Sequence, residues 1–428
     1  MKAKALLLAP VLAVALLIPL WAYDFGGTID NSTTITVSDG TTFLQEDKLA
    51  LWFETPIGAS LDFAAQGSYT YTSERAYLFD VDFLWLRGSF LLGQAKRSQL
   101  GFRAGRFLLS EFTKLVLSDN IDGLELSWHT AKANTSLAVG YTGLQLDPVS
   151  TISITWADEN DEDLLAPPRL VGSLQARFPE AIRRQDLLVS ILLQQDLRPE
   201  DELIQEGEVF EVTGRGGRLS SQYFGLGLAG PLAASLYYDV FTYLETGTTL
   251  SYIEGVYEYA PIVAVFSGVT VRWFAERLLN SKAELRLVYS SGDEDFADLF
   301  TEGNRADRAT VFVPISRQEL AVAFSPRLGN LLLLEAQYSL KPVAALQTLL
   351  KGILFLRPTS GPISDPRVDP ATESKYLGTE IDGVVNFRPL SDLGTSLSLG
   401  LFLPMGGAFR DSYQEAEFRG ELQISFSF

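Results

Sequence analysis

The 428-residue sequence contains no cysteine and only one histidine, His129. Without cysteine the chain cannot form a disulfide or a cysteine-based zinc site. A single histidine removes most histidine metal sites and most Ser-His catalytic arrangements. His129 follows Trp128 at the end of a predicted strand, and no companion catalytic set stands on the neighbouring segments. We therefore predict that the chain is not an enzyme and has no metal and no cofactor.

Long hydrophobic runs are also scarce, and the only one lies at the N-terminus. Lys2 and Lys4 precede an apolar stretch over residues 5–20, with Pro19 and the small residue Ala22 near its end. This is the pattern of a secretory signal, and the stretch is shorter than the roughly 20 residues that a bilayer-spanning helix needs. We predict a cleaved signal over residues 1–22, with an uncleaved anchor as the alternative, and a single domain over residues 23–428. A membrane protein with this sequence would cross the bilayer as strands.

Basic residues are outnumbered, with 34 Lys and Arg against 53 Asp and Glu and a net charge of −19. Such a surface repels nucleic acid, which we exclude as a partner. The acidic excess favours cations over anions. Because much of it falls in predicted loops, where salt screens charges beyond roughly 10 Å, the preference should be weak.

The last twelve residues alternate strictly between two kinds of side chain. One set is polar: Glu417, Arg419, Glu421, Gln423, Ser425 and Ser427. The other is apolar or neutral: Phe418, Gly420, Leu422, Ile424, Phe426 and Phe428. A soluble sheet can show this alternation, but together with the N-terminal signal it predicts the closing strand of a transmembrane β-barrel. Phe426 and Phe428 are the expected assembly signal for periplasmic chaperones and the barrel-assembly machinery.

Similar alternation recurs about every twenty residues, for example over residues 77–85, 263–273 and 377–388. Aromatic residues such as Trp85, Trp128 and Trp273 stand near segment ends, as in the girdles of membrane barrels. The fold class is therefore all-β, a transmembrane antiparallel barrel of about sixteen to eighteen strands. Eighteen is favoured, and an even number returns both termini to the periplasm.

The predicted connections have two sizes. Thr246-Gly247 and residues 326–330 are typical of tight turns, whereas residues 147–168, 199–218, 291–314 and 358–375 are long and polar. Short periplasmic turns and long external loops are the arrangement of outer-membrane barrels. The segment Val343–Arg357 fits either a strand or a helix, because its leucine spacing satisfies both periods.

Charged residues on the polar faces of these segments are the candidates for the pore lining. Facing lipid instead, each Arg would cost about 2–4 kcal/mol at the bilayer midplane. Such charges either set a transverse field that filters ions or neutralise one another across neighbouring strands. The candidates are Asp80, Asp82, Arg103, Glu125, Arg272, Glu284, Arg286, Glu380, Asp382, Arg388, Arg419 and Glu421.

Several short stretches resemble the alginate-export family of outer-membrane porins. Residues 101–107 (GFRAGRF) and 121–126 (IDGLEL) are similar to early strands of that family. Residues 289–293 (YSSGD), with 312–314 (FVP), are similar to a strand exit and its loop, and residues 377–382 and 401–406 to the final strands. The resemblance implies an eighteen-stranded monomeric barrel that passes an anionic sugar polymer through an arginine-lined pore. The predicted lumen mixes both charges, so we carry over only a porin-like channel.

The sequence thus predicts an integral outer-membrane channel for passive diffusion of small hydrophilic solutes or ions, surrounded by outer-membrane lipid. Two alternatives stay open: an exporter of a sugar or anionic polymer, and a plugged, adhesin-like structural barrel. The pattern leaves open whether the barrel is a monomer or a trimer, and which loop narrows the pore.

Overall fold

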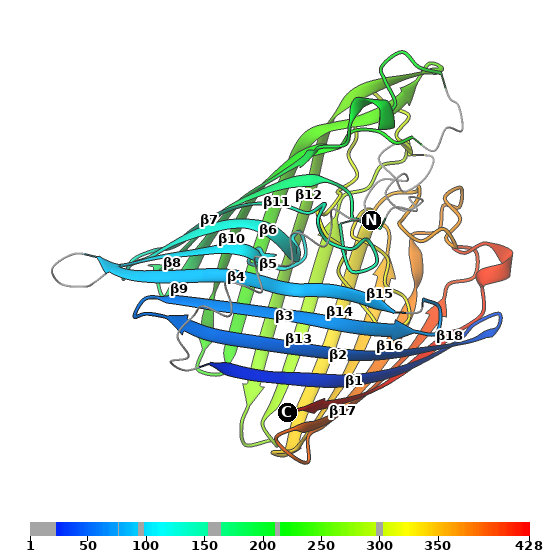
Figure 1. Cartoon of the computed structure of the whole chain (residues 1–428). Coiled ribbons are helices and arrows are strands. Elements are labelled where there is room, and N and C mark those ends of the chain that lie inside the picture. The colour runs from blue at the N-terminus through cyan, green and yellow to red at the C-terminus, as the bar shows by residue number, and fades with distance from the viewer. Residues whose placement is uncertain (1–22, 76, 93–97, 153–163, 210–214, 297–302) are drawn as a thin grey trace.

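The computed structural model shows a closed antiparallel β-barrel (Figure 1). The structure describes residues 23–75, 77–92, 98–152, 164–209, 215–296 and 303–428. Its described residues include the short 3-10 turns η2 (Glu200–Glu202) and η4 (Asp411–Tyr413). The strands are β1 (Asp24–Val37), β2 (Thr41–Ile57), β3 (Leu61–Thr72), β4 (Leu78–Leu92), β5 (Ser98–Ser110), β6 (Ser118–His129), β7 (Asn134–Tyr141), β8 (Arg169–Ile182), β9 (Gln185–Asp196), β10 (Ser220–Ala233), β11 (Leu236–Ile253), β12 (Val256–Ala275), β13 (Ser281–Ser290), β14 (Leu331–Val343), β15 (Leu346–Leu356), β16 (Tyr376–Phe387), β17 (Leu393–Pro404) and β18 (Glu417–Ser427).

Each strand pairs with its neighbours along the chain, and the ring closes between β1 and β18. Their register runs from Thr28 opposite Ser427 to Val37 opposite Phe418. At the end of the ring, Gly27 and Phe428 exchange two backbone hydrogen bonds of 3.0 Å. The prediction of eighteen strands is confirmed. The undecided segment Val343–Arg357 is strand β15 with a tight turn before it.

The connections separate into two ends of the barrel. At the turn end, the described connections have no more than five residues, such as residues 183–184 and 344–345. At the loop end they reach forty residues, in the connection over residues 291–330. The four long predicted loops all lie at the loop end. Two predicted tight turns are wrong. Thr246-Gly247 lies inside β11, which together with β12 extends beyond the neighbouring strands β10 and β13, and residues 326–330 belong to the longest described connection.

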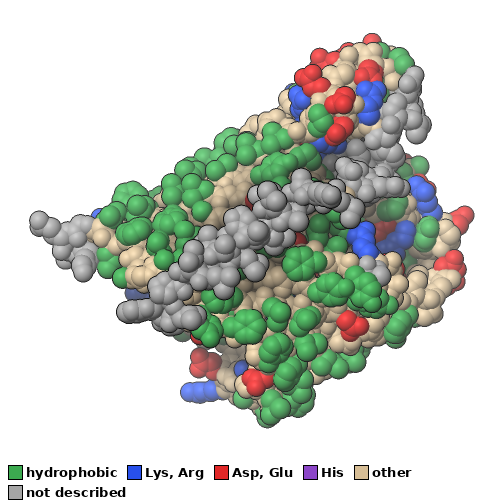
Figure 2. Space-filling view, viewed as in Figure 1, with side chains coloured by type: hydrophobic (Ala, Val, Ile, Leu, Met, Phe, Trp, Pro, Cys, Tyr) green, Lys and Arg blue, Asp and Glu red, His purple; other side chains and the backbone are tan. Residues whose placement is uncertain are grey.

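The outer face of the barrel is apolar. On β18, Phe418, Leu422, Ile424 and Phe426 are all exposed, and the other strands repeat this pattern with Leu, Val and aromatic side chains. Figure 2 shows hydrophobic side chains covering the flank, while charged side chains gather on the protruding tip. No helix in the described ranges is long and apolar enough to cross a membrane.

Trp85, which we predicted to lie in the outer aromatic girdle, faces the inside of the barrel instead. A β-bulge at Asp82 shifts the register of β4 against β3 between Gln66 and Gly67. Because strand side chains alternate, one extra residue reverses the facing of everything beyond it. Trp85 therefore packs against the inner core rather than joining the outer girdle. Trp128 and Trp273 are exposed, as predicted for a girdle.

Candidate functional site

The lumen is narrowed by two loops that fold inward from the loop end. Loop L3 (residues 111–117) and loop L7 (residues 291–330, described except 297–302) meet inside the barrel. The carbonyl of Val116 in L3 accepts hydrogen bonds from the N–H groups of Ile315 at 2.9 Å and Ser316 at 3.1 Å in L7. The Ser316 hydroxyl in turn accepts the N–H of Ser118 at 2.8 Å. L3 and L7 therefore form a continuous bridge across the lumen, which we call the L3–L7 bridge.

Three buried carboxylates hold this bridge by accepting backbone N–H groups. Glu111 accepts the N–H groups of Leu115 and Val116, at 2.9 and 3.1 Å, and the hydroxyl of Tyr243 from β11, at 2.7 Å. Glu245 on β11 accepts the N–H of Val313 in L7 at 2.9 Å. Glu380 on β16 accepts the N–H groups of Ala323 and Phe324, farther along L7. Leaving a buried donor or acceptor without its hydrogen bond costs about 1–3 kcal/mol, so these anchors fix the position of both loops.

Aromatic packing fills the space between the bridge and the barrel wall. Phe324 of L7 stacks on Phe402 of β17, with ring centroids 4.2 Å apart, and contacts Phe355 of β15 edge-on at 4.9 Å. On the other arm of L7, Phe312 stacks on Phe266 of β12 at 4.9 Å. The hydrophobic core of this protein therefore lies inside the barrel. It makes the constriction rigid, because a filled core resists displacement.

Most predicted pore residues near β4, β5 and β6 lie in ion pairs. Arg103 pairs with Glu125 across β5 and β6 at 2.7 Å, as the neutralising interpretation predicts. Asp82 accepts Lys48 of β2 at 3.1 Å together with two polar neighbours. Asp80 lies 3.5 Å from Arg106. Lys48 and Arg106 were absent from the predicted set.

A second group of ion pairs joins β11 to β14. Arg272 pairs with Glu284 at 3.1 Å and also with Asp239 of β11. Glu284 accepts Lys282 at 2.9 Å as well. Arg286 lies 3.8 Å from Glu335. The structure therefore brings Arg272 and Glu284 together, and adds partners that the sequence analysis missed: Asp239, Lys282 and Glu335.

Glu380 and Asp382 are both fully buried on one face of β16. Asp382 pairs with Lys351 of β15 at 3.0 Å, and Lys351 also donates to the carbonyl of Leu320 in L7. These two carboxylates therefore support the L3–L7 bridge rather than line an open pore. Lys351 was missed because it lies in the segment whose type the sequence left undecided.

The three remaining predicted pore residues, Arg388, Arg419 and Glu421, lie outside these groups of ion pairs. Glu421 of β18 accepts the hydroxyl of Ser32 on β1 at 3.1 Å. Arg419 lies on β18 opposite Thr36 and Gly400, and it has no ion pair among the residues that the structure describes. Arg388 follows β16 in the turn over residues 388–392, where its side chain donates to the carbonyl of Ser391. Arg388 is thus a turn-end residue rather than part of the strand wall.

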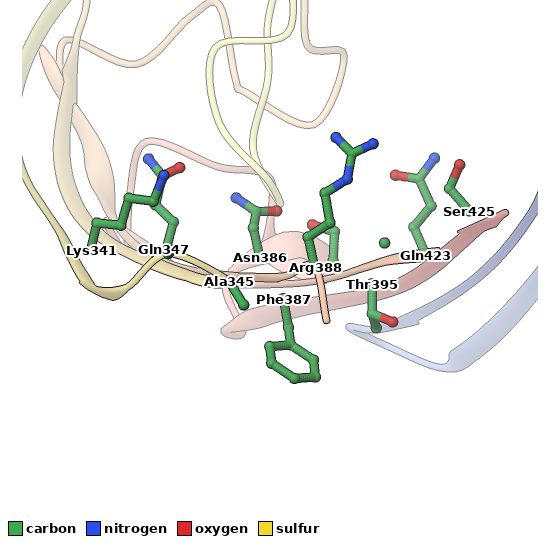
Figure 3. Close-up of a pocket in the computed structure, with 12 residues that line it drawn as sticks. Lys341, Ala345, Gln347, Asn386, Phe387, Arg388, Thr395, Gln423 and Ser425 are labelled. Atoms are coloured by element: carbon green, nitrogen blue, oxygen red, sulfur yellow. The ribbon is translucent and has the colours of Figure 1, made fainter. Parts of the chain in front are cut away.

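A hollow of about 420 Å³ opens at the turn end of the lumen. Figure 3 shows Lys341, Gln347, Asn386 and Arg388 on the lumen side of the sheet, with Phe387 on the opposite side. Within the described ranges, the side chains of Lys341, Gln347 and Asn386 have no hydrogen-bond partner, so they are available to a solute. No acidic residue lines this hollow. The sequence offered no signal for it, because Lys341 and Arg388 belong to different hairpins.

The large loops at the loop end carry their own ion pairs. Arg367, in loop L8 (residues 357–375), pairs with Asp365 at 2.7 Å and with Glu417. Burial lowers the pKa of Arg367, but these two carboxylates more than offset that effect and raise the pKa above its ordinary value. In loop L5 (residues 197–219, described except 210–214), Arg215 pairs with Glu208. The hydrogen bond from Arg215, followed by one from the N–H of Gln205, lowers the pKa of Glu208 below its ordinary 4.5.

His129, the only histidine of the sequence, contacts an amide side chain in the structure. His129 lies at the turn end of β6 with Nδ1 3.3 Å from the Asn134 side-chain oxygen. No group of three or more His, Asp or Glu side chains among the described residues has a geometry that could hold a metal ion.

Comparison with solved structures gives a fold likeness over nearly the whole chain. OpdQ of Pseudomonas aeruginosa superposes with a TM-score of 0.59 at 9% identity, covering 96% of this chain and 99% of that one. OccK2 (OpdF) of the same organism, solved in complex with glucuronate, gives 0.56 at 10% identity, covering 95% and 98%. The outer membrane protein opdK gives 0.57 at 11% identity, covering 95% and 99%. The chain therefore shares the barrel fold of these proteins.

Sequence comparison adds no relative to these structural neighbours. No family model matches the chain. No curated protein matches it either.

Proposed function

We propose that this chain is an integral outer-membrane, porin-like channel for passive diffusion of small hydrophilic solutes, with a weak preference for cations. The observation that carries the proposal is the combination of an apolar outer face with a charged lumen that the L3–L7 bridge narrows. A barrel of this kind needs lipid outside and water inside. The fold likeness to the outer membrane protein opdK supports the same location.

The proposed orientation puts the loop end outside the cell and the turn end in the periplasm. It follows the arrangement of bacterial outer-membrane barrels, which have short periplasmic turns and long external loops. Residues 1–22, outside the described ranges, would be the cleaved export signal. Outer-membrane lipid, periplasmic chaperones and the barrel-assembly machinery would be the partners in the membrane and during insertion.

The carboxylates along β18, β1 and β2 support the weak cation preference. Asp30, Glu46 and Glu421 lie on the lumen faces of these three adjacent strands and are only partly buried. None has an ion pair within the described part of the chain. Among the described residues, Arg419 on β18 is the one cation on this wall without an ion pair, so three carboxylates against one arginine give the wall a net negative potential.

Single-channel recording in a planar bilayer, with a salt gradient across it, tests the proposal. Residues 23–428 should give discrete conductance steps and a reversal potential that leans modestly toward cations. The simultaneous replacements Asp30→Asn, Glu46→Gln and Glu421→Gln should remove that lean while conductance persists. No conductance from a demonstrably folded barrel would contradict the channel and favour the plugged, adhesin-like alternative.

The turn-end hollow favours a second candidate, passage of an acidic sugar or an anionic polymer. Lys341 and Arg388 supply positive charge there, and Gln347 and Asn386 supply hydrogen-bond donors. The glucuronate complex of OccK2 is an example of such a ligand in a barrel of this fold. Glucuronate should then reduce the ion current, and Lys341→Gln with Arg388→Gln should abolish that effect. Unchanged current in glucuronate would contradict this second candidate.

A further inference from the structure

The hydrogen-bonded wall of the barrel is interrupted between β4 and β5. The pairing of β3 with β4 continues toward the loop end as far as Thr70 opposite Leu78, and that of β5 with β6 as far as Ser110 opposite Ser118. Between β4 and β5 the pairing stops much earlier, at Leu84 opposite Arg106. Residues 78–83 of β4 and 107–110 of β5 therefore continue as strands without pairing with each other. We call this gap in the ladder the β4–β5 seam.

Local backbone features on both strands produce the seam. The bulge at Asp82 bends β4, since the extra residue twists the strand away from its neighbour. On β5, Gly105 has a φ of 119°, which L-residues rarely adopt, and a Cβ at this position would overlap the carbonyl oxygen of Leu84. The strands therefore come very close at Leu84 and Gly105, and they part immediately beyond that point.

Arg106 closes the seam at the point where the strands part. Its guanidinium donates to the carbonyl of Val81 on β4 at 3.1 Å and to Asp122 on β6 at 2.8 Å. It also donates at 2.8 Å to the carbonyl of Leu144, in loop L4 (residues 142–168, described except 153–163). Asn120 of β6 donates across the same gap to the carbonyl of Asp82 at 3.3 Å. Side chains thus replace the missing backbone ladder, and side-chain contacts can separate without unfolding a strand.

The seam has an apolar rim on both faces. On the outer face, Phe79, Leu108 and Leu144 are 65%, 53% and 56% exposed. Phe79 lies opposite Tyr69, within the apolar outer surface of the barrel. On the inner face, Phe107 belongs to the core inside the barrel, and Trp85 packs against that core. An apolar chain moving through the seam would therefore contact apolar side chains on both sides.

We propose that the β4–β5 seam is a lateral passage, closed by Arg106, through which a single-chain amphiphile moves between the membrane and the lumen. The apolar tail would pass between Phe79 and Leu108, and the polar head would meet Arg106, Asp80 and Asp122. This activity goes beyond the diffusion of hydrophilic solutes through the barrel axis, because its substrate enters from the bilayer.

Current block by dodecylphosphocholine, below its micelle concentration, tests the passage. Headgroup-only phosphocholine is the matched probe without a tail. Val81→Cys with Leu108→Cys, joined by a short bis-maleimide, ties the seam shut, and the cysteine-free chain makes this labelling specific. Leu86→Cys with Ala104→Cys is the matched control, because these residues already face each other in the paired part of the same two strands.

The expected result is that the cross-linked seam lowers the frequency of tail-dependent block by about tenfold, which corresponds to roughly 1.4 kcal/mol. The control cross-link should leave the block unchanged. Equal block in both cross-linked channels, or no tail-dependent block in the unmodified chain, would overturn the passage. The basal ion conductance of the cross-linked channel is read in the same recording, so loss of the porin function is seen separately.

A second variant tests the role of Arg106 itself. Arg106→Ala removes the side chain that joins β4, β6 and L4, and it should raise the frequency of tail-dependent block. Arg177→Ala is the control, since Arg177 of β8 pairs with Asp186 of β9 at the exposed turn end, on strands that do not form the seam. Block frequencies that match between Arg106→Ala and the unmodified channel would contradict the assignment of Arg106 as the closing residue.

Discussion

The carboxylate of Glu380 on β16 accepts a hydrogen bond of 2.8 Å from the backbone N–H of Phe324 in L7. It also accepts the neighbouring N–H of Ala323 at 2.6 Å. A buried wall residue thus holds a loop in the middle of the lumen. Replacement Glu380→Gln should weaken this anchor by about 1–3 kcal/mol, because the amide NH₂ group opposes one of the two backbone N–H donors and leaves it without a partner. We expect a larger and noisier single-channel current.

Glu421→Gln is the control for this experiment. It also removes one lumen carboxylate, but Glu421 bonds to Ser32 on the wall and to neither inward loop. Its conductance should stay near that of the unmodified chain. A Glu380→Gln channel as quiet and as narrow as the Glu421→Gln channel would show that Glu380 does not hold L7.

Gly105 is required by the backbone where β4 and β5 approach most closely. Gly105→Ala should cost about 1–3 kcal/mol, since its positive φ is strained for alanine and the added methyl group meets the Leu84 carbonyl. The urea midpoint of the folded barrel should fall. Gly383→Ala on β16 is the control, because a Cβ there meets no atom within 4 Å. Equal midpoints for the two variants would refute the close-approach argument.

The terminal aromatic residue has two separable roles. Deleting Phe428 removes the proposed assembly signal and both backbone hydrogen bonds to Gly27. Phe428→Ala removes only the ring and keeps the backbone. If the ring is the signal, both variants should insert poorly in cells, whereas Phe43→Ala, which removes another exposed outer ring, should insert normally. Insertion yield can be followed by the heat-dependent gel mobility of the folded barrel, and normal yield from Phe428→Ala would rule out the ring as a signal.

Loop L5 should loosen in acid. Hydrogen bonding lowers the pKa of Glu208 in the folded loop, so the pair with Arg215 stabilises L5 fully above the ordinary pKa of 4.5. That stabilisation is lost as the pH falls through the lower folded-state pKa. Hydrogen exchange at the N–H of Gln205, which Glu208 accepts at 2.9 Å, should report it after correction for the intrinsic pH effect. Protection in a Glu208→Gln variant should not depend on pH over this range; the same acid response in that variant would assign the effect elsewhere.

Strand pattern was the most predictable part of this fold, because two different solvents act on the two faces of each strand. In β18 every second side chain must tolerate lipid, so Phe418, Leu422 and Ile424 mark their strand without any knowledge of neighbours. The reversal at Trp85 could not be predicted in this way. It depends on one extra residue, Asp82, and nothing in the local composition distinguishes a bulged strand from a regular one.

The polar face of a strand could be recognised from the sequence, but the partners of its charged residues could not. Arg103 and Glu125 could be placed facing inward from their own strands, yet their pairing depends on the register between β5 and β6. L7 was harder to anticipate. Val313 and Phe324 look like ordinary loop residues, and their burial follows from contacts with Glu245 on β11 and Glu380 on β16. Those contacts join positions separated by tens of residues, which no local period encodes.

The backbone hydrogen bonds between Gly27 and Phe428 join the two ends of the chain, so the sheet has no free edge there. A circularly permuted chain, with the old ends joined by a short linker and new ends cut at residues 388–392, would keep every strand pair. It would, however, place a different residue at the C-terminus. Such a chain would separate the thermodynamic requirement of a closed ring from the proposed recognition of a terminal aromatic residue. In this sequence Phe428 carries the ring-closing hydrogen bonds and the proposed signal together.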